Sequence, residues 1–266
     1  MNEAQALEFA KTLAHEAGAI MLKEFMIGVT AEYKDDKSPV TIADTAINDL
    51  VIEKIIQAYP THSVRGEEAS NMLDGSEYVW VCDPIDGTTA FSHGIPTNVF
   101  SLTLTKDGQP ILGVVYDPYM ERLYTAHKGN GVFVNGRALK VNQQNLDTAW
   151  LGLASFHSPY VDAPKVHYAL ERRDIRRLCS TSTIYESMLV AAGQLGGQIY
   201  VNTKAHDVAS AKLFVEEAGG RVTDLFGQDQ RYDQEVTGMV ASNGIIHDEL
   251  LAILAENRIR PKYSVS

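Results

Sequence analysis

One stretch constrains the fold of this chain more than any other: the residues from Tyr78 to Phe91, which read Y-V-W-V-C-D-P-I-D-G-T-T-A-F. The first five are apolar and β-prone, and such a run bounded by turn residues predicts a buried strand. We expect this strand to break at Asp83-Pro84, ahead of a second carboxylate at Asp86 and a turn at Gly87.

The two carboxylates are followed by hydroxyl residues that suit the start of a helix. Thr88 and Thr89 are expected to cap this helix, which leaves backbone N–H groups pointing outward. Carboxylates bind hard cations, and free N–H groups bind phosphate oxygens. The stretch therefore predicts a metal-assisted phosphate site, although Asp-Pro and Asp-Gly also occur in ordinary turns.

Composition narrows the classes of partner. The chain has 266 residues, 45% of them hydrophobic, which is ample for a core, and its formal net charge of -11 argues against nucleic acid as a partner. Cys82 and Cys179 are too few for a disulfide framework or a zinc site, so a reducing cytoplasm is expected. We see no signal peptide and no apolar run long enough to cross a membrane. A cytoplasmic protein without a membrane partner is therefore expected.

The first half of the chain predicts helices followed by antiparallel strands. Periodicity predicts an amphipathic helix over residues 3–27, ended by Gly28, and a second helix that Thr41 caps and Pro60 stops. Strands are expected at 62–65, 99–104, 111–116, 122–126 and 131–134. Residues 99–104 and 111–116 flank Asp107-Gly108, which indicates a hairpin. We expect the two helices to cover this antiparallel sheet.

The second half alternates strands with helices. Strands are expected at 150–153, 177–179, 198–201, 221–223 and 239–241, and helices at 164–173, 184–192, 208–218 and 248–257. Such alternation predicts an α/β layer. The fold class is therefore expected to be α+β in the first half and α/β in a smaller second half. We place a metal-binding domain at 1–140 and a domain that completes the site at 141–266.

Further acids lie where elements are expected to begin or end. Asp44 falls in the first turn of the second helix, Glu67 follows a glycine after a strand, and Asp207 opens a helix. Each alone has an ordinary explanation, because the helix dipole favours acids at helix starts and adjacent acids such as Glu67-Glu68 are common on surface loops. Both explanations stay open for each acid taken by itself.

Four motifs, in this order along the chain, resemble the inositol monophosphatase family. They are S-P-V-T-I-A-D at 38–44, G-E-E at 66–68, D-P-I-D-G-T-T-A-F at 83–91, and D-V-A-S-A followed by E-E-A-G-G between 207 and 220. That family is part of a group of Mg²⁺-dependent, lithium-sensitive phosphatases that includes fructose-1,6-bisphosphatase. The resemblance covers nearly the whole chain, and it implies a layered α-β-α-β-α fold and a homodimer.

The resemblance also implies a set of metal ligands. Glu67, Asp83 and the backbone carbonyl of Ile85 are expected to bind one Mg²⁺, and Asp83, Asp86 and Asp207 a second. A third, weaker ion would rest on Glu67, so two to three ions are expected. Two such ions about 4 Å apart can bind both the attacking and the leaving oxygens of an in-line displacement.

Other matched positions are expected to contact water and substrate. Asp44 and Thr88 resemble the pair that orders the attacking water, and Gly87 and Thr88 match the positions whose backbone N–H groups hold the phosphate. Asp86, Ser182 and Tyr200 are expected beside the substrate.

The residues expected around the leaving alcohol depart from the family pattern. Tyr200 stands where inositol-specific members carry an acid that binds substrate hydroxyls, His206 where tryptophan is usual, and Thr181 where glycine is expected. We interpret His206 as a ring that replaces the indole in packing, because imidazole is a poorer ligand of Mg²⁺ than carboxylate. The phosphate chemistry is therefore expected to be retained, with myo-inositol 1-phosphate not the best substrate.

The leading interpretation is a Mg²⁺-dependent phosphomonoesterase that acts on a small polyol, sugar or amino-alcohol phosphate. Histidinol phosphate, fructose 1,6-bisphosphate and 3′-phosphoadenosine nucleotides are alternatives, the last two less favoured because segment 69–78 is short. Outside the enzymes, the alternatives are a regulatory protein that binds a phosphate ligand and a structural protein that binds an anion. Lys34 and Lys37 either face the phosphate or belong to a solvated loop.

Overall fold

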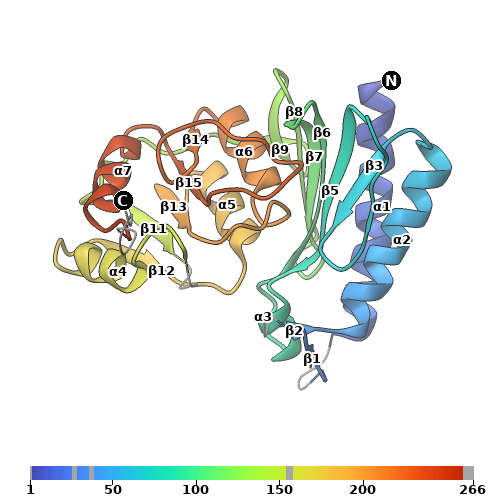
Figure 1. The fold of residues 1–266 in the computed structure, drawn as a ribbon, viewed down its shortest axis with the longest axis horizontal. Coiled ribbons are helices and arrows are strands. Elements are labelled where there is room, and N and C mark those ends of the chain that lie inside the picture. The colour runs from blue at the N-terminus through green and yellow to red at the C-terminus, as the bar shows by residue number, and fades with distance from the viewer. Residues whose placement is uncertain (1, 26–28, 36–38, 154–157, 260–266) are drawn as a thin grey trace, which may run out of the picture.

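The computed structural model describes residues 2–25, 29–35, 39–153 and 158–259. Within these ranges the elements stack in five layers, which Figure 1 shows edge on. α1 (Glu3–Glu24) and α2 (Ile42–Ala58) form one outer layer, and α5 (Thr183–Ala191) and α6 (Ala209–Glu217) form the middle layer between two sheets. The layered α-β-α-β-α fold is therefore confirmed.

The larger sheet has eight strands in the described ranges, in the order β10-β9-β8-β7-β6-β5-β3-β4. They are β3 (Ser63–Gly66), β4 (Ser70–Asn71), β5 (Tyr78–Asp86), β6 (Val99–Lys106), β7 (Gln109–Asp117), β8 (Arg122–His127), β9 (Gly131–Val134) and β10 (Arg137–Ala138). The expected hairpin of β6 and β7 is confirmed. One pair differs from the expected antiparallel order, because β3 and β5 are parallel. After β3 the chain forms the edge strand β4 on one side of β3, and it then returns to form β5 on the other side.

Strand β5 lies inside the larger sheet and is buried on both faces. Trp80 and Cys82 pack toward α1 and α2, whereas Val79 and Val81 face the middle helix layer. The expected break of this strand at Asp83 is wrong, because β5 runs on to Asp86. Its register against β6 shifts between Asp83 and Asp86, where Pro84 has no N–H to donate, so the ladder is interrupted without ending.

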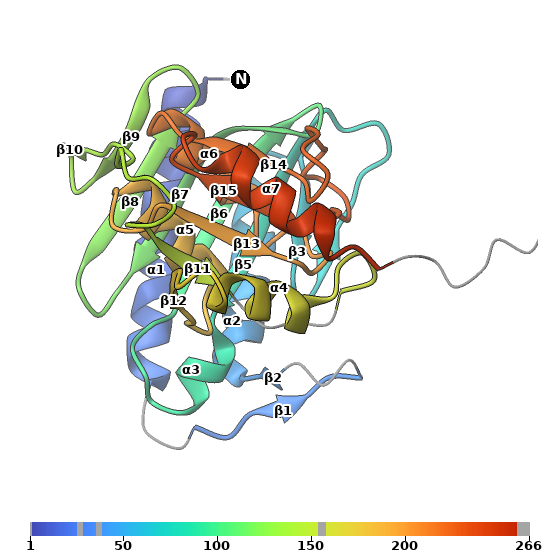
Figure 2. The same ribbon diagram turned by 90° about the vertical axis from the view of Figure 1, so that its left-hand side faces the viewer.

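The smaller sheet has the strand order β12-β11-β13-β15-β14. Its strands are β11 (Trp150–Leu153), β12 (Arg176–Leu178), β13 (Gly197–Tyr200), β14 (Arg221–Thr223) and β15 (Met239–Ser242). β11 is parallel to β12 and β13, whereas β15 is antiparallel to β13 and β14. α4 (Ala163–Glu171) and α7 (His247–Glu256) cover its outer face, which Figure 2 turns toward the viewer. The expected mixed second half is confirmed.

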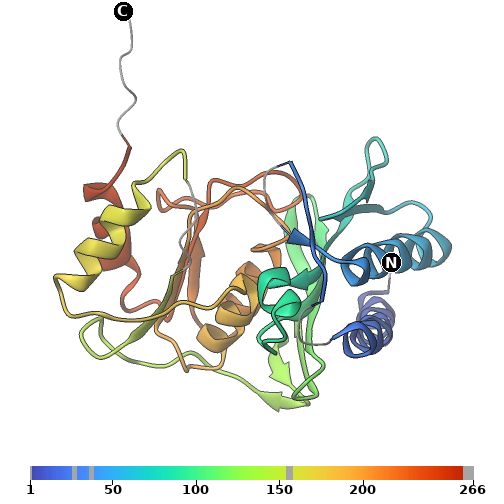
Figure 3. The same ribbon diagram turned by 90° about the horizontal axis from the view of Figure 1, so that it is seen from below.

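Two short features lie at one end of the larger sheet. The ribbon of β1 (Glu32–Tyr33) and β2 (Pro39–Val40) and the helix α3 (Thr88–Ser92) are seen there from below in Figure 3. The first helix ends at Glu24, earlier than expected, and Gly28, which we expected to end it, lies outside the described residues.

The described residues form three apolar cores between the layers, and the middle core contains residues from both halves of the chain. It contains Val99 and Val115 of the larger sheet together with Ile184 of α5 and Phe214 of α6. Periodicity alone placed only the first two helices against the larger sheet, and a second helix layer was expected only from the family resemblance. Among the described helices we find none with the length and apolar character that crossing a membrane requires.

Candidate active site

Asp83, Asp86 and Asp207 lie together although they are far apart in the sequence. One carboxylate oxygen of each lies within 4.8 Å of those of the other two. Asp83 and Asp86 come from the end of β5, and Asp207 comes from the loop between β13 and α6. The structure therefore brings acids from both halves of the chain to one place, as a shared metal site requires.

Burial and mutual repulsion raise the pKa of each of these carboxyls. Burial, then the charges of Glu67 and Asp86, raise the pKa of Asp83 well above its usual range. Burial and the charge of Asp207 raise the pKa of Asp86 to about 8, and burial also raises the pKa of Asp207. Oδ1 of Asp83 is buried and has no hydrogen-bond partner among the described residues. These all-oxygen groups fit a hard divalent cation, which would offset their repulsion and occupy the unpartnered oxygen.

The start of α5 holds Asp86 in place. Its carboxylate accepts hydrogen bonds from the backbone N–H groups of Thr183 at 3.1 Å, Ile184 at 2.7 Å and Tyr185 at 3.3 Å. The hydroxyl of Ser182, which also caps α5, donates to the same carboxylate. Ser182 is buried and its hydroxyl is directed at Asp86, so its expected place beside the substrate stays a prediction.

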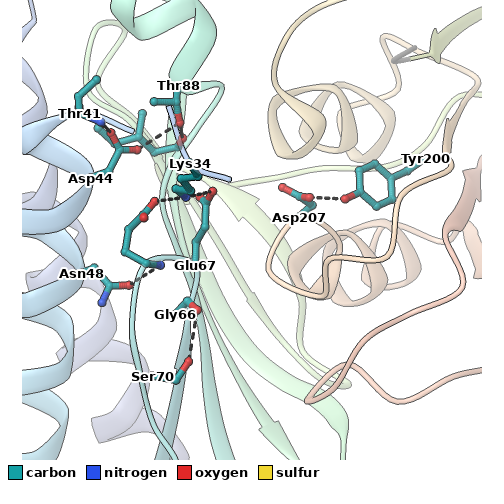
Figure 4. Close-up of polar contacts among 12 residues, drawn as sticks. Lys34, Thr41, Asp44, Asn48, Gly66, Glu67, Ser70, Thr88, Tyr200 and Asp207 are labelled. Atoms are coloured by element: carbon teal, nitrogen blue, oxygen red, sulfur yellow. Dashed lines mark hydrogen bonds and ion pairs between the residues drawn. The ribbon is translucent and has the colours of Figure 1, made fainter. Parts of the chain in front are cut away.

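Asp44 and Thr88 form a second group, which Figure 4 shows across the site from Asp207. Asp44 is fully buried in the first turn of α2, where it accepts hydrogen bonds from the N–H and the hydroxyl of Thr41 at 2.8 and 2.5 Å. The hydroxyl of Thr88 lies 3.1 Å from Oδ1 of Asp44 and 3.0 Å from the carbonyl oxygen of Ile85. Burial raises the pKa of Asp44 to about 6. The structure thus places the expected water-ordering pair in direct contact.

Glu67 and Glu68 are not a simple solvated pair. Nζ of Lys34 lies 2.9 Å from Oε1 of Glu67 and 2.6 Å from Oε1 of Glu68. Burial alone would lower the pKa of Lys34, but the two carboxylates outweigh it and raise the pKa above its usual value. Lys34 therefore faces the site from the end of β1, as Figure 4 shows, while Lys37 lies outside the described residues.

A glycine starts the short helix α3. Gly87 is the N-cap with φ +93°, so the expectation that Thr88 or Thr89 caps this helix is wrong. A Cβ atom at Gly87 would lie 3.0 Å from Cβ of Ser182 and 3.1 Å from the carbonyl oxygen of Thr97, so a larger residue would be crowded as well as strained by the positive φ. The hydroxyl of Thr88 is then free of capping and reaches Asp44.

The clustered acids, Glu67 and Thr88 border a cleft of about 190 Å³, whereas Asp44 and Ser182 do not line it. It is lined by Lys34, Pro39, Glu67, Asp83, Ile85, Asp86, Gly87, Thr88, Thr89, Thr181, Thr183, Asn202, Lys204, His206 and Asp207. Asn202 and Lys204 were missed from the sequence, because a polar residue in a loop carries no periodic signal. Thr183, the first residue of α5, was missed as well. His206, which we interpreted as a packing residue, borders the cleft beside Asp207.

Tyr200, which we expected beside the substrate, lies behind the wall of the cleft and does not line it. It is 1% exposed, and its hydroxyl donates to Oδ2 of Asp207, as seen on the right of Figure 4. The backbone N–H of Lys204 also hydrogen-bonds this hydroxyl. Burial and the charge of Asp207 raise the pKa of Tyr200, so the phenol stays neutral and supports Asp207.

Known proteins resemble this chain over most of its length. The sequence profile of the inositol monophosphatase family matches residues 2–259. A fructose-1,6-bisphosphatase/inositol-1-monophosphatase of Aquifex aeolicus is 32% identical over 262 residues, which cover 95% of this chain and 96% of the relative. A Nus factor SuhB of Pseudomonas aeruginosa is 32% identical over 237 residues, which cover 84% and 87% of the two chains. A solved structure of an IMPase from Thermotoga maritima shares the fold with a TM-score of 0.85 at 27% identity, covering 95% of this chain and 97% of its own.

Proposed function

The chain belongs to the inositol monophosphatase family and hydrolyses phosphate monoesters, and on this basis we propose that it is a Mg²⁺-dependent phosphatase of small phosphorylated metabolites. The observation that carries the proposal is the convergence of Asp83, Asp86 and Asp207 within 4.8 Å. Polyol, sugar and amino-alcohol phosphates are the substrate classes that the sequence leaves open.

In this proposal each Mg²⁺ is bound by a particular set of residues. Asp83, Asp86 and Asp207 would hold one Mg²⁺, and Glu67, Asp83 and the Ile85 carbonyl another, with two to three ions in all. Mg²⁺ bound there supplies a Lewis acid for the phosphate oxygens and lowers the pKa of water. Oδ1 of Asp83 has no hydrogen-bond donor in the described part of the chain, which supports this assignment, because a buried carboxylate oxygen without a donor is costly.

The remaining groups of the site position the reactants. Gly87 and Thr88 would hold the phosphate through their backbone N–H groups, because the first N–H groups of a helix have no partner within it. The hydroxyl of Thr88, in contact with Asp44, would accept a hydrogen bond from the attacking water and hold it in line with the phosphorus. No nucleophilic side chain is needed for this reaction.

A phosphate-binding regulatory protein is the alternative from another class. Two relatives are named Nus factor SuhB, which supports keeping this alternative. The complete set of acids together with the contact between Asp44 and Thr88 supports turnover, because a protein that only binds a phosphate ligand has no use for a group that orders water. The homodimer, the cytoplasmic location and a domain boundary near residue 140 stay predictions.

The proposal is tested by measuring phosphate release from a panel of small esters with Mg²⁺ and with EDTA. We expect phosphate release only with Mg²⁺. Asp86→Asn should lower turnover by a factor of about 100 or more. Asp86→Asn should also lose the stabilisation that Mg²⁺ gives the wild type in thermal unfolding, since ligand binding to the folded state stabilises it. Asp147→Asn, which changes an exposed acid outside the cleft, is the matched control. The proposal is contradicted if EDTA leaves phosphate release unchanged, or if none of the esters releases phosphate.

A further inference from the structure

Tyr200 is the last residue of β13, and its side chain ends on one of the clustered acids. The ring is 1% exposed, and its hydroxyl donates a hydrogen bond to Oδ2 of Asp207. Figure 4 shows the ring on the side of Asp207 that faces away from Glu67 and Thr88. The hydroxyl therefore reaches this carboxylate from behind the cleft, which Tyr200 does not line.

The position of this hydroxyl is fixed by the fold around it. Tyr200 pairs with Met239 of β15, and its ring belongs to the middle apolar core. The backbone N–H of Lys204 hydrogen-bonds the same hydroxyl group. The backbone, the ring and the polar end of this side chain are thus each held by a different partner, so its hydroxyl is a rigid donor.

Asp207 is placed by a loop, whereas the other two acids of the cluster lie in a strand. Asp83 and Asp86 belong to β5, and Asp86 is also held by the start of α5. Asp207 precedes α6, which begins at Ala209. The χ2 angle of an aspartate is broadly distributed, so a hydrogen bond to one carboxylate oxygen determines where the other oxygen points.

We propose that Tyr200 is a positioning residue of the metal site, whose hydroxyl holds the Asp207 carboxylate in the orientation that binds Mg²⁺. The inference rests on the proposed function, in which Asp207 is a ligand of Mg²⁺ together with Asp83 and Asp86. It changes the role of Tyr200 from the expected substrate contact to a support of the metal site. A phenol suits this role, because it donates a hydrogen bond and adds no further negative charge to the three acids.

Tyr200→Phe tests the proposal, because it removes the hydroxyl and keeps the ring in the core. Mg²⁺ and, separately, Ca²⁺ are titrated calorimetrically into the wild type and the variant without any ester. We expect the dissociation constant for Mg²⁺ to rise about tenfold or more, as is usual when the hydrogen-bond partner of a metal ligand is removed. The rise should be smaller for Ca²⁺, because Ca²⁺ accepts irregular geometry, whereas Mg²⁺ requires a nearly ideal octahedron.

Two controls separate this role from a general loss of structure. Tyr232→Phe removes the hydroxyl of another fully buried tyrosine of the same core, which does not line the cleft, and should leave both dissociation constants unchanged. Urea unfolding in EDTA measures how far each variant is destabilised without metal. If Tyr200→Phe lowers the unfolding midpoint but binds Mg²⁺ as the wild type does, the hydroxyl is only structural and the proposal is overturned.

Kinetics distinguish support of the metal from contact with the substrate. In Tyr200→Phe the Mg²⁺ concentration that gives half-maximal activity should rise by the same factor as the dissociation constant. At saturating Mg²⁺ the KM for the ester should equal that of the wild type, because Tyr200 does not line the cleft. A raised KM with unchanged Mg²⁺ binding would return Tyr200 to the substrate and overturn the proposal.

The outcomes for the inference and for the proposed function are distinct. Unchanged Mg²⁺ binding in Tyr200→Phe, or an equal loss for Mg²⁺ and Ca²⁺, overturns the inference while a phosphatase that depends on Mg²⁺ stands. If no ester is hydrolysed, the proposed function fails, and the calorimetric titration still decides the inference. A wild type that binds no Mg²⁺ overturns both.

Discussion

At the scale of single residues, the hydroxyl of Thr88 joins two parts of the site. It contacts the carboxylate of Asp44, which begins α2, and the carbonyl of Ile85, which lies between two of the clustered acids. One hydroxyl hydrogen thus links the helix layer to the end of β5, and the oxygen of the same group still has a lone pair for water.

Replacing this hydroxyl tests its assigned role. We expect Thr88→Ala to lower kcat about 100-fold or more with little change in KM, because an interaction with the attacking water is made in the transition state. Thr88→Ser keeps the hydroxyl and should keep most of the activity. Steady-state kinetics and urea unfolding of both variants give the comparison. A loss of kcat that is equal in the two variants would contradict the role of the hydroxyl.

Which site residues could be predicted depended on how each is placed. Asp83 and Asp86 lie in the last part of β5, and Glu67 directly follows β3. Such positions can be recognised in a sequence, because an apolar run leads into the acids. Lys204 was missed, because a lysine between a strand and a helix is usually solvated and only the fold shows which way it faces. The pairing of Lys34 with Glu67 likewise joins residues of different elements, so no local pattern contains it.

At the scale of elements, α5 connects a buried acid to the cleft. Glu186 on α5 is fully buried, and its Oε1 accepts a hydrogen bond from the backbone N–H of Ser180 at 2.7 Å. The hydroxyl of Ser180 in turn donates to the carbonyl of Ser182, the residue that contacts Asp86. Glu186 therefore orders the segment that leads into α5 and holds Asp86.

The free energy of unfolding should depend on pH through the ionisation of Glu186. Burial raises its pKa from 4.5 to about 7, so between these values the folded protein keeps a proton that the unfolded chain releases. The free energy of unfolding should therefore fall as pH rises through this window, by at most about 3 kcal/mol from this group. Glu186→Gln cannot ionise and should lack this part of the fall, measured by urea unfolding at pH 5 and pH 8.

The difference between the wild type and Glu186→Gln isolates this group, since the clustered acids are present in both proteins. Glu8→Gln changes a side chain that is 72% exposed and should follow the wild type at both pH values. An equal fall in Glu186→Gln and the wild type would show that Glu186 is ionised throughout.

Helices and strands with a clear hydrophobic periodicity were predicted well, whereas the points at which they end were not. The hairpin of β6 and β7 was predicted because Asp107-Gly108 separates two apolar runs. β5 was ended too early, because Asp83-Pro84 has the composition of a turn, whereas in the fold both residues are covered and the strand continues past them. Local turn chemistry was overridden there by burial from both sides.

At the scale of the whole molecule, the middle core makes the two halves depend on each other. Val99 and Val115 from the first half pack in one core with Ile184 and Phe214 from the second half. A boundary near residue 140 would therefore not separate two independent cores. The sequence could not show this. The apolar stripes on α5 and α6 indicate that each helix packs against an apolar surface, but they do not identify that surface.

This shared core predicts one unfolding transition. In Trp150→Phe the remaining tryptophan is Trp80, which is fully buried in the first half. Its fluorescence and the far-ultraviolet circular dichroism of the whole chain should give the same midpoint in urea. Phe214→Ala, which removes a fully buried ring, should lower both midpoints together and the free energy of unfolding by about 3–5 kcal/mol. Separate midpoints would show that the halves unfold independently.

The place of the α5–α6 layer has a consequence for how such an enzyme evolves. Asp86 projects from one sheet and Asp207 from the loop of another, and the thickness of the helices between those sheets sets how far apart the two carboxylates stand. A change of side-chain volume in that layer alters the gap between them without touching any group in the cleft. Selection for turnover thus acts on residues that no substrate meets, and laboratory evolution of this enzyme should accumulate adaptive changes in apolar positions of α5 and α6 as well as around the reaction centre.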